Sequence, residues 1–131
     1  MPRDITMVTP VPLGLADWRA AAAAASKSAP EPARLIGLAP GESFSARPQG
    51  ALVVVSAPGL GVVLTAAASQ AATTAHDVAR LFPEAGRLAR RGAWWTEAWA
   101  PWGAGGAAGA AIARALANSV GGLAQAADGD R

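Results

Sequence analysis

The sequence contains no cysteine and no tyrosine, and it has a single histidine, His76. Without cysteine the chain can form neither a disulfide nor a thiolate metal site, and its redox compartment is left open. A single histidine also excludes a metal site built from several histidines and a mechanism that needs two of them. We therefore expect neither a metal site nor a cofactor.

Lysine is almost absent too, because Lys27 is the only lysine among the eleven basic residues. The formal net charge is +2, yet the sequence pI is about 10.4. The two values agree, since hardly any group titrates between neutral pH and the arginines. The pI therefore overstates how basic the chain is, and we do not expect nucleic acid as its main partner.

Large apolar side chains are scarce. The 131 residues include two Phe and five Trp, and much of the 52% hydrophobic content is alanine. At about 25 cal/mol per Å² of buried apolar surface, a core of such small side chains stabilises a fold weakly. The length suits one small domain. We infer that self-association, a partner or a membrane supplies part of the burial, and we expect a homo- or hetero-oligomer.

Residues 51–66, ALVVVSAPGLGVVLTA, are the most informative stretch. Two β-branched runs flank Pro58-Gly59, which suits the central positions of a type II turn, because Gly59 accepts a positive φ. This pattern predicts a hairpin. The alternative is a membrane span, since residues 51–75 contain no charge and are long enough to cross a hydrocarbon core of about 30 Å.

Turn-forming proline and glycine residues around this hairpin predict a small antiparallel meander over residues 33–66. Pro40, Pro48 and Pro58 recur at the spacing expected of short strands joined by turns. The expected strands are 34–38, 43–47, 51–56 and 61–65. With helices predicted at 67–81, 83–91 and 103–127, the fold class is α+β; the alternative is a mainly α protein with a transmembrane helix at 51–75.

The N-terminal region is expected to stand apart. Closely spaced Pro10, Pro12 and Gly14 predict an extended segment over residues 1–14, either a mobile tail or an arm docked on a neighbouring subunit. Asp17 could then cap a linker helix over 18–28, anchored by Trp18. We therefore divide the chain into an arm and linker helix (1–32), a small domain (33–127) and a tail (128–131).

The N-terminus also lacks the continuous apolar run of a secretory signal. This favours a cytoplasmic or assembly-associated location, with the membrane as the alternative.

Two sets of apolar or small residues are candidate interfaces. The valine runs do not alternate with polar residues, so both faces of that hairpin require cover. Small residues recur every fourth position after Gly103, a spacing that lets helices approach closely. Arg114 argues against a lipid-exposed span there, so we expect this helix to pack on another protein helix. The candidate interface residues are Val53, Val54, Val55, Val62, Val63, Leu64, Gly105, Gly109, Ala113 and Ala117.

A cluster of arginines and tryptophans is the other candidate site. It could sit at a bilayer interface or bind single-stranded nucleic acid, whereas its structural interpretation is indoles that anchor the core and arginines that end a helix. The cluster comprises Arg87, Arg90, Arg91, Trp94, Trp95, Trp99 and Trp102.

No catalytic motif is present. His76 and Asp77 are adjacent, so on a helix they diverge by about 100° and cannot form a dyad. The glycine pattern after Gly103 lacks the Lys-Ser/Thr of a phosphate loop. We therefore expect a non-enzymatic structural or assembly subunit of a larger complex, the alternatives being a small single-span membrane protein with a Trp/Arg interfacial helix and a nucleic-acid-binding module.

Overall fold

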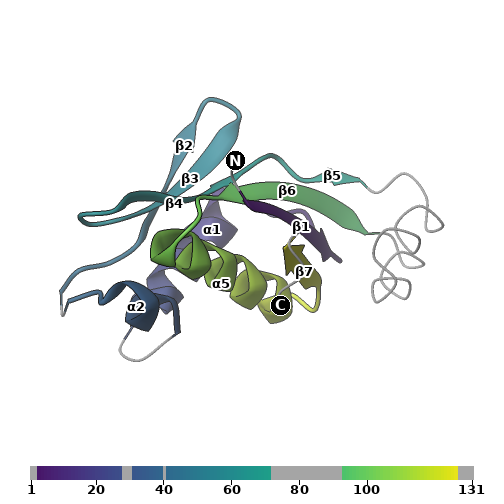
Figure 1. Cartoon of the computed structure of the whole chain (residues 1–131). Coiled ribbons are helices and arrows are strands. Elements are labelled where there is room, and N and C mark those ends of the chain that lie inside the picture. Colours follow the sequence, from purple (N-terminus) through teal and green to yellow (C-terminus); the bar gives the residue numbers. More distant parts are fainter. Residues whose placement is uncertain (1–2, 28–30, 40, 72–92, 127–131) are drawn as a thin grey trace.

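The computed structural model describes residues 3–27, 31–39, 41–71 and 93–126. It confirms the α+β class, with an antiparallel sheet of seven strands and three helices in the described ranges (Figure 1). In chain order the elements are β1 (Arg3–Thr9), α1 (Leu15–Ala25), α2 (Glu31–Ile36), β2 (Ser45–Gln49), β3 (Leu52–Ala57), β4 (Gly61–Ala66), β5 (Gln70–Ala71), β6 (Trp94–Ala100), α5 (Ala104–Ser119) and β7 (Leu123–Ala126).

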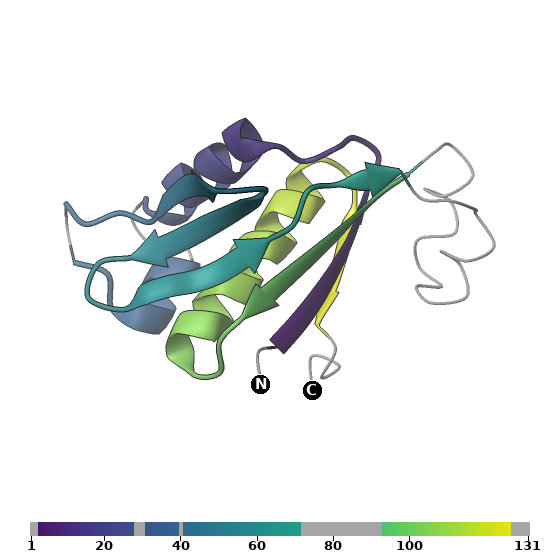
Figure 2. The ribbon, with the colours of Figure 1, turned by 90° about the horizontal axis from the view of Figure 1, so that it is seen from above.

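The sheet and the helices form two layers. The strand order is β2-β3-β4-β6-β1-β7, and the short β5 pairs with β6 beside β4. All three helices lie on the same side of the sheet, so that Figure 1 shows them below it and Figure 2 looks onto the opposite face. Every strand pair is antiparallel.

The predicted hairpin is present as β3 and β4. The Leu60 amide donates to the Ala57 carbonyl at 3.2 Å, and Gly59 has a φ of 79°. This is the geometry expected of a type II turn with Pro58 and Gly59 at its centre. Residues 51–71 of the stretch considered as a span therefore form strands and turns, and none of the helices in the described ranges is long and apolar enough to cross a membrane.

The prediction of the first strand of the meander is wrong. Residues 34–38 were expected to be extended, but α2 covers most of them. Pro32 lies in the first turn of this helix, where proline is well tolerated. Gly37, with a φ of 65°, ends it: Gly37 N donates to Arg34 O and Leu38 N to Ala33 O, the paired bonds of a Schellman motif.

The expectation of an N-terminal arm is also wrong for residues 3–9. They form β1, which lies inside the sheet between β6 and β7. Ile5 and Met7 point toward the helices and are 1% and 0% exposed. Residues 3–9 are extended as predicted, and Asp4 to Met7 alternate in burial; the prolines that suggested a separate arm come only after the strand has ended.

Helix α1 is part of the core rather than a linker. It begins at Leu15, earlier than predicted, because Gly14 is the N-cap, and the Gly14 amide donates to Asp17 Oδ2 at 2.8 Å. Asp17 thus supports the first turn from inside the helix. Trp18 is 1% exposed and packs in the core, as the prediction of an anchor required.

Helix α1 also closes the outer edge of β2. Arg19 Nε donates to the Ala46 carbonyl at 3.2 Å, and the Phe44 amide donates to Ser26 Oγ at 2.8 Å. Pro48, on the same strand, has no amide hydrogen to offer. This edge is therefore poorly suited to adding a further strand.

The region after β4 departs from the prediction where it is described. A helix was expected over 67–81, but the Ala67 amide donates to the Glu97 carbonyl at 2.9 Å and β5 follows. The remainder of that helix and the one expected at 83–91 lie outside the described residues. The helix predicted over 103–127 ends at Ser119, where Gly121 (φ 82°) forms a second Schellman motif with Gly122, and β7 follows.

Helix α5 lies unusually close to the sheet. A Cβ added to Gly109 would overlap the carbonyl oxygen of Val63, and one added to Gly106 would overlap that of Pro101. The small residues after Gly103 therefore permit a close approach, but the surface they approach is the sheet of the same chain. Gly105, by contrast, has room for a Cβ, 3.6 Å from Val63 Cγ1.

We predict that Gly109→Ala lowers the free energy of unfolding by about 1–3 kcal/mol or more, because the new methyl group forces α5 away from β4. Gly105→Ala is the matched control and should raise it by roughly 0.5–1 kcal/mol, since alanine is the better helix former. Urea unfolding followed by circular dichroism measures both. Similar effects of the two substitutions would contradict the close approach.

Candidate functional site

The face of the sheet opposite the helices is the candidate site. On β6 the side chains alternate: Thr96, Ala98 and Ala100 are fully buried, and the two alanines belong to the core under the helices. Trp95, Glu97 and Trp99 therefore point to the other face, where each remains partly exposed. Figure 2 looks onto this face, and no described helix or strand crosses it.

One row of directly opposed side chains crosses five strands on this face. Each residue of the row is paired with the next one on the neighbouring strand, from β1 through β6, β4 and β3 to β2. Residues that are paired across strands point to the same face. In order, the row is Asp4, Trp99, Thr65, Val54 and Arg47. It has an acid at one end, a base at the other and an indole near the acid.

A hollow lies beside the indole of Trp99. It has a volume of about 400 Å³ and is lined by Val62, Thr65, Trp99, Ala100 and Pro101. Val62 is 42% exposed, and Leu52, also on this face, is 36% exposed. The hollow is large enough to take an apolar side chain from another molecule.

The second indole, that of Trp95, is held by a carboxylate. Trp95 Nε1 donates to Glu97 Oε1 at 2.6 Å. Val8 is the cross-strand neighbour of both Trp95 and Leu123, and it is fully buried although it lies on the helix-free face. The indole is thus fixed in place, as a preformed contact surface requires.

The described charges on this face are mixed and slightly acidic. They are Asp4 and Glu97 on one side and Arg47 on the other, as the strand pairing assigns them. Phosphate backbones bind where basic side chains gather, and these residues provide one base against two acids. The described part of the face therefore does not gather basic side chains.

Most of the predicted interface residues on the hairpin are buried within the chain itself. Val54, Val55, Val63 and Leu64 are at most 3% exposed, leaving Val53 partly buried and Val62 on the surface. A β-bulge explains this: Val55 pairs with Leu64 and Ser56 with Val62, so Val63 is the extra residue. Val63 and Leu64 consequently both join the core under the helices.

The same holds for the small residues of α5. Gly109, Ala113 and Ala117 are buried, and Gly105 is partly buried. Their periodicity reflects the close packing of α5 on its own sheet.

The Arg/Trp cluster does not form one patch within the described residues. Arg87, Arg90 and Arg91 lie outside them. The tryptophans separate because β6 alternates: Trp95 and Trp99 lie on the helix-free face, Trp94 is partly buried at the start of the strand, and Trp102, 56% exposed, lies beyond its end with the Arg3 guanidinium 4.9 Å from its ring centre. Recognition of a strand over 94–100 would have revealed this separation.

Ser69 is a partly buried side chain that links the segment before α1 to β6. Its hydroxyl accepts from the Leu13 amide at 2.8 Å and lies 2.7 Å from Thr96 Oγ1. Among the described residues, these contacts include neither a base nor a carboxylate that would activate the hydroxyl. No group of three or more metal-ligating side chains occurs in the described ranges, and His76 lies outside them.

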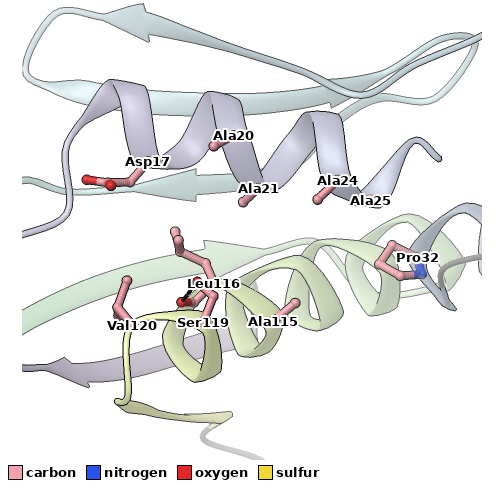
Figure 3. Close-up of a pocket in the computed structure, with 10 residues that line it drawn as sticks. All are labelled: Asp17, Ala20, Ala21, Ala24, Ala25, Pro32, Ala115, Leu116, Ser119 and Val120. Atoms are coloured by element: carbon pink, nitrogen blue, oxygen red, sulfur yellow. Dashed lines mark hydrogen bonds between the residues drawn. The ribbon is translucent and has the colours of Figure 1, made fainter.

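A second hollow, between α1 and α5, is shown in Figure 3. It has a volume of about 460 Å³, and alanines form half of its lining, four from α1 and one, Ala115, from α5. Its two polar side chains already have partners: Asp17 Oδ2 accepts from Gly14, and Ser119 Oγ donates to Leu116 O at 2.7 Å. Because ligand sites usually offer free polar groups that orient the ligand, this groove is the weaker candidate.

Comparison with protein-family models, with curated proteins and with solved structures finds no match to this chain.

We predict that Ser69→Ala lowers the free energy of unfolding by about 1–3 kcal/mol, because the Leu13 amide and the fully buried Thr96 hydroxyl each lose a partner. Ser119→Ala is the control, since that side chain is exposed and should change stability by less than about 0.5 kcal/mol. Urea unfolding compares the two. A loss for Ser69→Ala no larger than for the control would contradict the network.

Proposed function

We propose that this protein is a non-enzymatic assembly subunit that binds another protein through the helix-free face of its sheet. The observation that carries the proposal is the pair of partly exposed indoles, Trp95 and Trp99, on a face that no described element covers. Tryptophan is enriched where protein interfaces gain most of their binding energy. The hollow beside Trp99 and the exposed Val62 add apolar contact area.

The composition of the face supports a protein partner. An interface typically has an apolar centre with polar groups at its rim. Here Trp99 and Val62 supply apolar surface, while Asp4 and Arg47 lie at the two ends of the row of paired side chains. A partner that places an apolar side chain in the hollow and a charged side chain at either end of the row would complement it.

A nucleic-acid partner is the alternative that the indoles leave open, because bases stack on exposed aromatic side chains. Its electrostatic signature differs, since binding through phosphates weakens steeply as salt is raised. Salt dependence of binding therefore separates the two. A protein interface dominated by Trp99 should change little between 50 and 200 mM salt, while loss of about 10³-fold or more in affinity would favour nucleic acid.

We predict that Trp99→Ala weakens association by at least about tenfold, because truncating a central indole typically costs 2 kcal/mol or more. Trp102→Ala is the matched control: it removes the same side chain from an exposed position beyond the end of β6. Both variants and the unaltered protein serve as bait in cells that produce the chain, and quantitative mass spectrometry compares what they retain. The retained protein is then purified, and its affinity for each variant is measured by titration.

The proposal requires that the partner be lost with Trp99→Ala and kept with Trp102→Ala, both in cells and with purified components. Equal retention by the two variants would place the interface elsewhere. Circular dichroism and thermal unfolding verify that each variant keeps its fold.

A further inference from the structure

We propose that the molecule received by the helix-free face is a second copy of this chain, packed face to face about a two-fold axis that runs parallel to the strands. This inference rests on the proposed function and names its partner. It follows from the order of charges along the row Asp4, Trp99, Thr65, Val54 and Arg47.

The two ends of the row cannot neutralise each other within one chain. Asp4 lies on β1 and Arg47 on β2, four strand spacings apart, which at about 4.8 Å each amounts to roughly 19 Å. Both side chains are exposed. Among the described residues, neither side chain forms an ion pair or a side-chain hydrogen bond.

A two-fold axis that lies midway between the two sheets and passes over Thr65, the middle residue of the row, reverses the row in the second copy. Asp4 then lies opposite Arg47 of the partner subunit, and the same pair forms again at the other end by symmetry. The axis also brings Trp99 over strand β3 of the other molecule, opposite Val54, which is 3% exposed, and beside Leu52, which is 36% exposed. Sheets packed face to face lie about 10 Å apart, a gap that long side chains from both sides can bridge.

The alternative in which the row runs in the same direction in both copies is disfavoured. It would place Asp4 over Asp4 and Arg47 over Arg47, and like charges brought together across an interface are costly. The charge order therefore selects the two-fold axis that runs parallel to the strands over the one that runs along the row. An isologous dimer of this kind closes on itself, so it would not grow into a fibre.

The expected affinity is modest. A patch roughly 19 Å wide and five residues long, at about 3.4 Å per residue, covers roughly 300 Å² in projection, less than the ~800 Å² per partner of a standard stable interface. We therefore expect a dissociation constant in the micromolar range or weaker, and sedimentation has to reach concentrations of several hundred micromolar.

The test reverses one charge at a time. Asp4→Arg alone and Arg47→Asp alone each place like charges opposite one another at both ends of the dimer, so each variant should self-associate at least about tenfold more weakly than the unaltered protein. A one-to-one mixture of the two variants restores opposite charges at both ends. We expect the mixture to form a heterodimer with an affinity within about threefold of the original.

Arg34→Asp is the control, because it makes the same charge change at an exposed position on α2, in the helical layer. It should leave self-association unchanged. All three substitutions are at exposed positions, and circular dichroism confirms that each variant folds. Restoration in the mixture cannot arise within a single chain, because neither variant carries both substitutions.

Two results would overturn the second copy as partner: an unaltered protein that stays monomeric at several hundred micromolar, or a mixture no more associated than the separate variants. If either is seen while Trp99→Ala still abolishes binding of a different protein, the proposed function stands and only the identity of the partner fails. If Trp99→Ala affects neither self-association nor binding of another protein, both proposals fail.

Discussion

The close approach of α5 to the sheet is the contact on which the rest of the structure depends. Gly109 brings the helix backbone against the carbonyl oxygen of Val63 in β4, and Gly106 brings it against that of Pro101, in the connection between β6 and α5. Neither position has space for a side chain. A core with few large residues reaches interior packing density only if its elements lie this close together. The alanines of β6 and α5 that fill the space between them are therefore matched to that short distance.

The placement of the helices on one side of the sheet leaves the side chains of the other face pointing outward. The three described helices all lie on one side, so the core accounts for half of each strand's side chains and the other half faces outward (Figure 1). Small residues dominate toward the helices, whereas two of the five tryptophans point away from them. Trp18 is the tryptophan of the core. Two further indoles partly exposed on the face opposite the helices are the physical basis for placing an interface there.

Local signals in the sequence were reliable where a single short-range interaction decides the geometry. Pro58-Gly59 predicted the turn between β3 and β4 because glycine alone readily adopts a positive φ there. The same reasoning was available at Gly37 and Gly121, each of which ends a helix in a Schellman motif. Those two glycines would have corrected the strand expected over 34–38 and the helix expected to continue to 127.

Long-range pairing explains most of the remaining errors. Residues 3–9 alternate as a strand does, yet nothing local shows that β6, some ninety residues later, pairs with them along their whole length. The tryptophans of 94–102 could be read as a cluster until that pairing established a two-residue period, which sends neighbouring side chains to opposite faces. The β-bulge at Val63 is likewise a property of two strands together.

The sequence by itself determined the fold class, the central hairpin, the burial of Trp18 and the need for small residues on α5, because each depends on composition or on neighbours a few positions apart. Only the tertiary structure decided which valines are buried, which indoles are exposed and which charges lie in one row. Those properties depend on the register between strands distant in the chain, and a shift of one residue in that register would have moved each of these side chains to the other face.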